Sequence, residues 1–533
     1  MKLRHLIGTI IAGADFLKIT NDGGDTEKIY DTEITSIVTD SRRAEAGSLF
    51  ICIKGTKSDG HDFITEAVER GAAFVIVEAG NEHKITAETA YAVAASTRKA
   101  ESLLWDAWYA HPSAGMKIIA VTGTNGKTST SYILRAIMKR AGYKTALIGT
   151  VRSLIGDDEY DMRGGSAMYG GETSSAMTTP DPEILYGAIS EMRERGTEVI
   201  IMEASSHAIE LEKLAGLASC GKIDAGIFTN LSPEHLDFHG SMENYAKAKA
   251  KLFSMCKTGI INGDSEYAND IENFSHQFGG GDEGCKFVRF SSRSETIVNH
   301  DITYTAVNVK SNGTDGVEYI LYSDKGVFEV ASPIPGMFTV YNTLAAISCA
   351  VEFGIGRDII ADAVKNLQGV DGRIERVTLG EDVDFSVFID YAHTPAALES
   401  MLCVVRGFRK KGQKITLVFG CGGDRDPAKR KVMGAIASRL ADFVIVTSDN
   451  ARSESPRKII LEILKGIDKE KPHIALENRA DAIEYAVTTA KKNDIIILAG
   501  KGHERYEIDK DGKHPFDEAE IVRKSTARTF KNN

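Results

Sequence analysis

Residues 123–128, which read GTNGKT, carry the clearest chemical signal in the sequence. They follow an apolar run and open a helical pattern, so their backbone N–H groups would surround phosphate oxygens at a helix N-terminus. Lys127 would reach the β- and γ-phosphates of a nucleotide, and the Thr128 hydroxyl would ligate Mg²⁺. The strict phosphate-loop pattern is incomplete, because Val121 stands where that pattern has its first glycine. The alternative is an ordinary glycine-rich turn, but the flanking pattern favours nucleotide binding.

Other side chains that could do chemistry do not identify a site by themselves. Residues 245–253 carry Lys247, Lys249 and Lys251, and their composition does not distinguish a solvated basic helix face from a site that uses one lysine. Glu203 follows an apolar run, where a carboxylate could equally be a surface residue or a helix cap. Their roles depend on a larger pattern.

The elements that must position these residues are short apolar runs alternating with helical patterns. Such runs predict strands buried on both faces of a parallel sheet, with chemistry at their carboxyl ends. Residues 128–142 show the helical spacing between two of them. The alternation predicts an α/β fold. The runs are residues 72–80, 116–123, 197–205, 224–230, 414–420, 442–449 and 493–500.

Composition excludes several classes of protein. The 533 residues suggest about three domains, and 42% hydrophobic with 26% charged residues is ordinary for a globular chain. The net charge of -11 argues against general binding to nucleic acid or anionic membranes. The seven cysteines are scattered without a CxxC pair, which favours free thiols in a reducing compartment. No apolar stretch reaches about 18 residues, so we expect a cytoplasmic protein that spans no membrane.

Changes of pattern predict three domains. The first covers residues 1–113 and ends where HPSAG interrupts the alternation. The second covers residues 114–368, and alternating segments within residues 265–335 predict antiparallel strands inside it. The strand–helix pattern restarts near residue 369, so the third domain covers residues 369–533.

Besides GTNGKT, eight segments stand in the order typical of one family, and together they resemble the Mur ligases. The resemblance runs from about Asp40 to Glu504, which is most of the chain. One such motif would be weak evidence, whereas the ordered set is specific. The segments are EASSH (203–207), NLSPEHLDFH (230–239), YAKAKAKLF (245–253), DGR (371–373), DYAHTP (390–395), GGDRD (422–426), DNAR (449–452) and GKGHE (500–504).

The resemblance implies an α/β protein with a uridine-nucleotide-binding N-terminal domain, a central P-loop ATPase-like domain with a mostly parallel sheet, and a Rossmann-like C-terminal domain. It implies an ATP-dependent ligase of peptidoglycan precursor synthesis. The carboxylate of UDP-MurNAc-L-Ala-D-Glu would take the γ-phosphate of ATP, and the amine of an amino acid would attack the acyl phosphate. The implied partners are these small molecules, without nucleic acid or membrane, and the implied state is a monomer.

The resemblance also assigns residues to ATP and its metal. Thr128, Glu203 and His235 would ligate Mg²⁺, and Glu203 has the oxygen chemistry that Mg²⁺ prefers. The family spacing Tyr-x-x-x-Lys-x-x-Leu-Phe selects Lys249; in relatives this lysine is carboxylated by CO₂, and the anionic carbamate would bind a second Mg²⁺. The catalytic residues would be Lys127, Lys249, His235 and Glu203. ATP would contact Gly123, Thr124, Asn125, Gly126, Lys127, Thr128, Ser129, Asn342, Arg373, Asp390 and His393.

Two further sets would bind the substrates. The DNAR segment keeps the arginine that pairs with the distal carboxylate of meso-diaminopimelate in relatives, and arginine suits a planar carboxylate. Arg452 therefore favours meso-diaminopimelate over L-lysine, although a surface ion pair is the alternative reading of this residue. The amino acid would contact Arg425, Asp449, Asn450, Arg452, Gly500 and Glu504. Within the UDP-substrate, the uridine nucleotide would contact Ser41, Arg42, Thr56, Lys57 and Ser58. The muramoyl peptide would contact Thr178, Thr179 and Ser205, with Lys213 on the same substrate side.

The chain departs from the family pattern at three places. Leu211 and Lys213 replace the usual Gln and Arg, which removes one hydrogen-bonding group and one bidentate fork. Ala451 replaces the usual Pro, and the segment 157–177 is longer than expected. The competing interpretations are the same ligase acting with L-lysine or another amino acid, a folylpolyglutamate synthetase, a catalytically silent ATP-binding paralogue, and a P-loop GTPase or motor.

Overall fold

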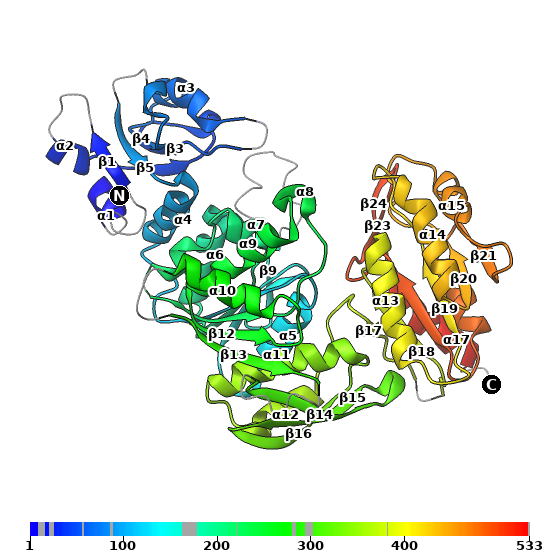
Figure 1. The fold of residues 1–533 in the computed structure, drawn as a ribbon. Coiled ribbons are helices and arrows are strands. Elements are labelled where there is room, and N and C mark those ends of the chain that lie inside the picture. The colour runs from blue at the N-terminus through cyan, green and yellow to red at the C-terminus, as the bar shows by residue number, and fades with distance from the viewer. Residues whose placement is uncertain are drawn as a thin grey trace. The chain divides into compact units, whose positions relative to one another are not determined.

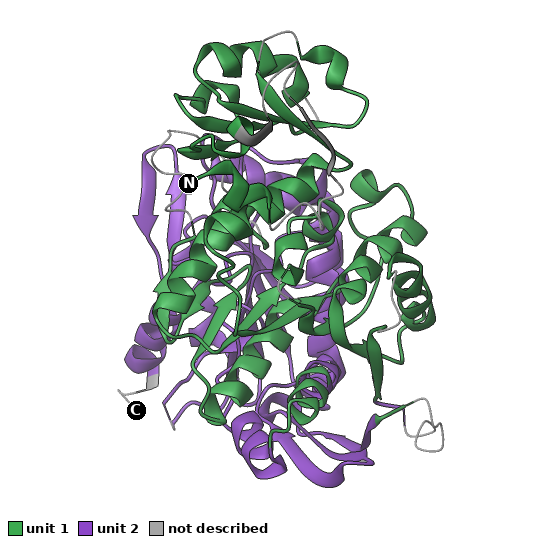
Figure 2. Ribbon diagram, turned by 90° about the vertical axis from the view of Figure 1, so that its left-hand side faces the viewer, with its two compact units in different colours: residues 1–291, 300–303, 345–355 green, residues 292–299, 304–344, 356–533 purple. Residues whose placement is uncertain are grey.

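Contacts along the chain divide the protein into two compact units (Figure 2). The first contains residues 1–291, 300–303 and 345–355, and the second contains residues 292–299, 304–344 and 356–533. The computed structural model describes residues 1–8, 16–20, 26–55, 58–85, 89–162, 178–219, 221–279, 284–293, 302–380 and 382–530. Within those ranges, no helix is long and apolar enough to cross a membrane. Most of the long 157–177 segment lies outside them.

The first unit begins with a five-stranded sheet in the order β1-β5-β4-β3-β2 (Figure 1). Its pairs are parallel except β1 with β5. The middle strands are buried on both faces, because alternate residues of β3 and β4 enter two different cores. The elements are α1 (Leu3–Ile7), β1 (Phe16–Thr20), α2 (Thr26–Tyr30), β2 (Ser36–Val38), β3 (Ser48–Ile51), α3 (Ile64–Glu69), β4 (Phe74–Glu78), β5 (Ala90–Ala94) and α4 (Thr97–Trp108).

The same unit continues with a mainly parallel sheet, in which the strand order is β13-β12-β11-β6-β10-β7-β8-β9. β8 and β9 add an antiparallel hairpin at one edge. The neighbours β11, β6 and β10 are parallel, so their carboxyl ends meet at one sheet edge. The elements are β6 (Lys117–Thr122), α5 (Lys127–Arg140), β7 (Thr145–Ile148), β8 (Ser153–Ile155), β9 (Asp158–Tyr160), α6 (Pro182–Glu194), β10 (Val199–Glu203), α7 (Ser206–Glu210), β11 (Ile223–Phe228), α8 (Leu236–His239), α9 (Met242–Ser254), β12 (Cys256–Asn262), α10 (Ala268–Phe278) and β13 (Lys286–Ser291).

The second unit contains a β-meander and a six-stranded sheet. β14 (Tyr304–Ser311), β15 (Val317–Ser323) and β16 (Gly326–Ser332) pair antiparallel, as the alternating segments predict. The other sheet has the order β17-β18-β22-β19-β20-β21 and is parallel except for β17. α11 (Met337–Glu352), of which residues 337–344 belong to this unit, and α12 (Arg357–Lys365) follow the meander. The sheet strands are β17 (Glu375–Arg376), β18 (Ser386–Asp390), β19 (Ile415–Phe419), β20 (Phe443–Val446), β21 (His473–Ala475) and β22 (Ile495–Ala499).

Helices cover both faces of the six-stranded sheet. Alternate residues of β18, β19, β20 and β22 pack against α13, α14 and α15 on one face, and the intervening residues pack against α16 and α17 on the other. All seven apolar runs form strands, so the α/β prediction is confirmed. The remaining elements are α13 (Pro395–Phe408), α14 (Ala428–Leu440), α15 (Pro456–Leu464), α16 (Arg479–Thr489), β23 (Tyr506–Asp509), β24 (Gly512–Pro515) and α17 (Glu518–Phe530).

Candidate functional site

The predicted phosphate loop is a turn between β6 and α5. Gly123 has φ +146°, and a Cβ added there would collide with the Thr229 hydroxyl, so the position requires glycine. Gly126, at φ +86°, is the N-cap of α5. Lys127 Nζ donates to Gly123 O at 2.9 Å and to Thr124 O at 3.0 Å, so its ammonium lies over the loop. The strand–turn–helix context expected from the sequence is therefore present.

The residues after β11 hold the loop in place. Asn230 accepts from Asn125 N and donates to Asn125 O, both at 3.0 Å. Thr229 Oγ1 donates to the same Asn125 O at 2.6 Å, and Thr124 N donates to Asn230 O at 2.9 Å. Because β11 lies next to β6, these bonds between the ends of neighbouring strands fix the conformation of the loop.

Glu203 ends β10 on the other side of β6 and is 1% exposed. Its carboxylate accepts hydrogen bonds from Thr128 Oγ1 at 3.1 Å, Thr150 N at 3.0 Å and Thr150 Oγ1 at 2.9 Å. A carboxylate and a loop hydroxyl are thus adjacent, and both are oxygen donors of the kind that Mg²⁺ prefers. Among the described residues, no group of three or more His, Cys, Asp or Glu side chains gathers as a metal site. A cation here would share its remaining positions between phosphate oxygens and water.

Three residues predicted to contact the muramoyl peptide surround Glu203. Thr179 Oγ1 donates to Glu203 O at 2.8 Å and accepts from Ser205 N at 3.0 Å. Thr178 Oγ1 lies 3.0 Å from Thr150 Oγ1. Ser205 also caps α7 by accepting from Ala208 N. The three hydroxyl groups therefore lie around Glu203, next to the phosphate loop.

Tyr245 on α9 connects the phosphate loop to His235 and Lys249. Its hydroxyl lies 3.3 Å from Thr124 Oγ1, and its ring centre lies 4.5 Å from Lys249 Nζ. The ring centres of His235 and Tyr245 are 6.4 Å apart. His235 has φ +55° at the N-cap of α8, and its ring meets that of His207 edge-on at 4.8 Å. The three motifs NLSPEHLDFH, YAKAKAKLF and GTNGKT therefore meet in space.

Burial separates the three lysines of α9. Lys247 pairs with Glu243 at 2.6 Å and Lys251 with Glu210 at 2.8 Å, and both side chains are about one-third exposed. Lys249 is 1% exposed and makes no hydrogen bond or ion pair to any described residue. Burial, with the nearby charge of Lys127 adding to it, lowers the pKa of Lys249 well below its usual value. Burial therefore penalises the charged form of Lys249.

The predicted uridine loops lie on the N-terminal sheet. Ser41 is buried and donates to Glu66 Oε2 at 2.8 Å, whereas Arg42 is exposed and pairs with Asp40 at 2.6 Å. Ser58 O accepts from Gly55 N at 2.9 Å; Thr56 and Lys57 lie outside the described residues.

Two ion pairs lie near the predicted peptide-binding residues. Arg43, next to Arg42, forms a bidentate ion pair with Glu183 of α6, in which both N···O distances are 3.1 Å. Lys213 pairs with Asp181 at 2.7 Å. The first pair ties the predicted uridine-binding turn to the helix that follows Thr178 and Thr179.

In the second unit, all six residues predicted to bind the amino acid line one pocket of about 350 Å³. They follow the carboxyl ends of β19, β20 and β22, where the parallel topology brings them together. The volume lies in the range of small-ligand sites. The lining residues are Tyr391, His393, Thr394, Gly422, Arg425, Asp426, Lys429, Asp449, Asn450, Arg452, Gly500 and Glu504.

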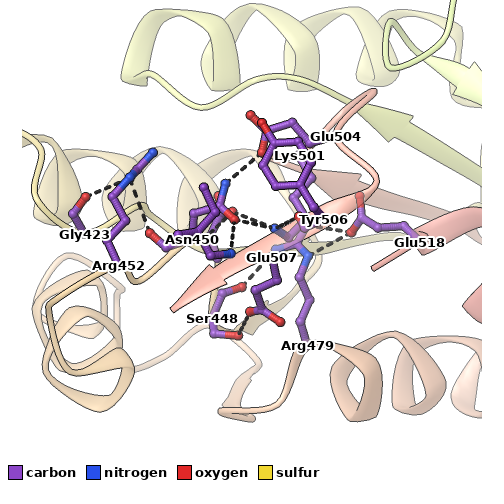
Figure 3. Close-up of polar contacts among 12 residues, drawn as sticks. Gly423, Ser448, Asn450, Arg452, Arg479, Lys501, Glu504, Tyr506, Glu507 and Glu518 are labelled. Atoms are coloured by element: carbon purple, nitrogen blue, oxygen red, sulfur yellow. Dashed lines mark hydrogen bonds and ion pairs between the residues drawn. The ribbon is translucent and has the colours of Figure 1, made fainter. Parts of the chain in front are cut away.

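A network of buried polar residues supports this pocket (Figure 3). Arg479, fully buried, donates to Glu518 Oε1 at 2.8 Å, to Ala499 O at 2.9 Å and to Ser448 O at 3.2 Å. It therefore joins the ends of β20 and β22 directly before Asp449 and Gly500. Burial by itself would raise the pKa of Asp449, but the charges of Arg479 and Lys501 hold it below its usual value.

Arg452 is held in a left-handed conformation at φ +50°. Its guanidinium donates to Gly423 O at 2.8 Å, and its backbone N–H donates to Ile508 O at 3.0 Å. Glu504 accepts from Asn450 Nδ2 at 2.7 Å, and burial raises its pKa. A guanidinium and a carboxylate thus line the same pocket.

The remaining residues predicted to contact ATP also lie in the second unit. Asp390 is buried, and its two carboxylate oxygens accept from Ile374 N and Ala392 N at 2.9 Å, so it shapes the turn of the DYAHTP segment. Arg373 lies over the Tyr391 ring at 5.7 Å, and His393 lines the pocket described above. Asn342 is buried on α11.

Sequence reasoning missed several residues that the structure places in these sites. Thr150, Asn230 and Tyr245 contact the predicted residues directly, and Tyr391 and Lys429 line the pocket. Thr150 and Asn230 follow β7 and β11 at the same carboxyl-end edge as Glu203. Their position after apolar runs is the signal that could have identified them.

A phosphate loop backed by a buried carboxylate is typical of enzymes that transfer phosphoryl groups from nucleotides. Together with a pocket of mixed charge on a second parallel sheet, it fits the class of ATP-dependent ligases. A curated relative from Syntrophomonas wolfei, named UDP-N-acetylmuramoyl-L-alanyl-D-glutamate–2,6-diaminopimelate ligase, is 39% identical over 92% of this chain and 94% of its own length. A relative from Clostridium acetobutylicum, named as ligase 1 of that activity, is 39% identical over 98% of both chains. The chain belongs to the Mur ligase family.

The family's domain profiles and a solved structure agree with this membership. The Mur ligase catalytic domain matches residues 33–103, the Mur ligase middle domain residues 121–350, and the Mur ligase glutamate ligase domain residues 372–502. A solved structure of a UDP-N-acetylmuramoyl-L-alanyl-D-glutamate–2,6-diaminopimelate ligase is 29% identical. It superposes with a TM-score of 0.66, covering 93% of this chain and 95% of that one.

Proposed function

We propose that this protein is the ligase that joins meso-diaminopimelate to UDP-MurNAc-L-Ala-D-Glu, with ATP converted to ADP and phosphate. The pocket of the second unit carries the proposal, because it places Arg452 and Arg425 in one cavity with Glu504. Diaminopimelate has a second ammonium and a second carboxylate, which these charges complement. L-Lysine has no distal carboxylate and would leave one arginine without an anionic partner.

The phosphate loop and Glu203 support the first half of the reaction. Thr128 and Glu203 fit a Mg²⁺ ion, since both offer oxygen donors and lie 3.1 Å apart. Such an ion would neutralise charge on the transferring phosphoryl group. Lys127 would contact the β- and γ-phosphates. His235 is assigned to the metal site by the family motif.

We also propose that Lys249 is carboxylated. Its neutral amine would attack CO₂, forming an N–C bond and releasing a proton, and would become a carbamate with two oxygen donors. Burial without an ion-pair partner supports this assignment, because an ammonium in that position would be uncompensated. Lys247 and Lys251 lack this setting.

The proposal extends to the acceptor and to the organisation of the chain. Ser41, Arg42, Thr56, Lys57 and Ser58 would bind the uridine nucleotide. Thr178, Thr179, Ser205 and Lys213 would bind the peptide, with Lys213 exchanging Asp181 for a substrate carboxylate. The domains would be residues 1–113, 114–368 and 369–533, acting as a cytoplasmic monomer without nucleic-acid or membrane partners.

Phosphate release tests the proposed function directly. The protein is incubated with ATP, Mg²⁺ and UDP-MurNAc-L-Ala-D-Glu, and meso-diaminopimelate is compared with L-lysine. Release with diaminopimelate alone is the expected result. Release with lysine alone would keep the ligase activity and refute the pocket argument. Release with neither would favour another amino acid or a silent paralogue.

We expect Arg452→Ala to raise the KM for meso-diaminopimelate by about 100-fold, since a charge-assisted fork to a carboxylate contributes roughly 1.5–3 kcal/mol. The KM for ATP stays near the wild-type value. Steady-state kinetics in each substrate measure both. Arg457→Ala is the matched control, because Arg457 is exposed on the neighbouring helix and lines no part of the pocket. Equal KM values for the two variants would place Arg452 outside the binding site.

A further inference from the structure

Lys501, in the GKGHE segment, lies behind the amino-acid pocket and does not line it. Its side chain is fully buried. Nζ donates to Tyr506 O at 2.9 Å and to Asn450 Oδ1 at 3.0 Å, and it lies 3.3 Å from Asp449 Oδ1 (Figure 3). These contacts use all three N–H donors of an ammonium. Lys501 therefore acts on the residues of the pocket and not on a ligand.

The first consequence concerns the Asn450 side-chain amide. Its Oδ1 faces two donors, Lys501 Nζ and Ile508 N, the second at 2.9 Å. The flipped amide would turn its own N–H₂ toward an ammonium, which has no acceptor capacity. Oδ1 must therefore face Lys501, and Nδ2 must face Glu504, which accepts at 2.7 Å. Lys501 thus determines where the Glu504 carboxylate is held.

The second consequence concerns the loop that carries Arg452. Lys501 anchors the start of β23 through Tyr506 O. Two residues further on, both backbone groups of Ile508 form hydrogen bonds with the loop that carries Arg452. The Ile508 N–H donates to Asn450 Oδ1, and the Ile508 C=O accepts from Arg452 N at 3.0 Å. A non-glycine residue at φ +50° needs such support. Lys501 therefore stabilises the conformation of Arg452 through β23.

We propose that Lys501 is a positioning residue for amino-acid recognition, which holds Asn450 and β23 so that Glu504 and Arg452 face the substrate's distal ammonium and carboxylate. The identity of that substrate rests on the proposed function above. The positioning itself is a property of the free protein, so it can be measured without turnover.

Lys501→Met removes the charge and the three donors while keeping an unbranched side chain. We expect the KM for meso-diaminopimelate to rise about 10- to 100-fold, the loss typical when a residue that orients a binding group is removed. The kcat stays within about threefold and the KM for ATP is unchanged, because the effect is confined to one pocket. In the free protein, hydrogen exchange of the Arg452 and Ile508 amides accelerates at least about tenfold. Lys510→Met is the control, since Lys510 is 80% exposed in the turn after β23.

The outcomes separate this proposal from the proposed function. Faster exchange with an unchanged KM would refute the role in recognition, and unchanged exchange in Lys501→Met would refute the positioning. A wild-type protein without diaminopimelate-dependent turnover would overturn the proposed function, while the exchange measurement would still decide the positioning. If Lys501→Met does not fold, Lys501→Gln retains donors for Asn450 or Tyr506 and is measured in the same way; wild-type values in that folded variant would overturn the need for the charge.

Discussion

A Lys249→Ala variant is expected to lose phosphate release by about three orders of magnitude, in line with the removal of one preorganised charge beside a transferring phosphoryl group. The fold should survive, because Lys249 makes no hydrogen bond or ion pair to a described residue and no partner is left without its bond. The Tyr245 ring stays in place through its own packing on α9, where it is 1% exposed. The loss should therefore fall on turnover and not on the circular dichroism spectrum.

If Lys249 carries a carbamate, a small carboxylic acid should partly replace it in the Lys249→Ala variant. Truncation leaves a buried space beside Tyr245 that a small carboxylic acid could enter, so acetate or propionate should restore part of the activity in a saturable manner. Lys247→Ala, on the same helix, loses an exposed pair with Glu243 and a contact of the ammonium with the Phe274 ring at 5.1 Å, both away from the phosphate loop, and should retain activity. A folded Lys249→Ala enzyme that no carboxylic acid restores would argue against the carbamate. Full activity of that variant would remove Lys249 from the mechanism.

The contrast between Lys249 and its neighbours shows what local patterns can predict. Apolar runs located β6, β10, β11, β19, β20 and β22, because strands buried on both faces are rich in apolar residues. They did not include β18, which ends at the candidate residue Asp390. The same reasoning left three lysines of α9 equivalent. Burial of Lys249 depends on how α9 packs against the phosphate loop, through contacts such as Tyr245 with Thr124, 121 residues apart. The spacing of apolar residues along α9 does not predict that contact.

The amino-acid pocket shows the same limit. Its predicted residues come from motifs at strand ends, and the parallel topology brings them together. The bonds that fix them come from elsewhere: β23 supplies Ile508 to the Arg452 loop, and Arg479 reaches Glu518 across 39 residues. Ile508, Arg479 and Glu518 belong to no sequence motif that marks them as part of a site. Only their contacts in the folded chain distinguish them. The sequence therefore predicted residues that line one pocket, but not the residues that position them.

Lys127→Ala is the second variant with a large expected effect, a fall in kcat of about 10³-fold or more, because transfer of a phosphoryl group depends almost entirely on positioning and charge neutralisation. The Lys127 ammonium donates to Gly123 O and Thr124 O, both contributed by the loop itself. Phosphate oxygens would replace these carbonyls as partners when the nucleotide binds. The loop conformation should persist in the variant, since Asn230 and Thr229 hold it independently of Lys127.

Single-turnover phosphate release measures this loss, and nucleotide affinity measured in parallel shows whether the loop still binds. Lys127→Arg tests geometry against charge: it keeps the positive charge, but its planar fork replaces a compact ammonium, so most activity should remain lost. Lys139→Ala is the control on the same helix, because Lys139 is half-exposed and, in the part of the chain that the structure describes, pairs with Asp157 alone. If Lys127→Ala released phosphate at a near-wild-type rate, the phosphate loop would be a structural turn, and the site of ATP cleavage would have to lie elsewhere in the chain.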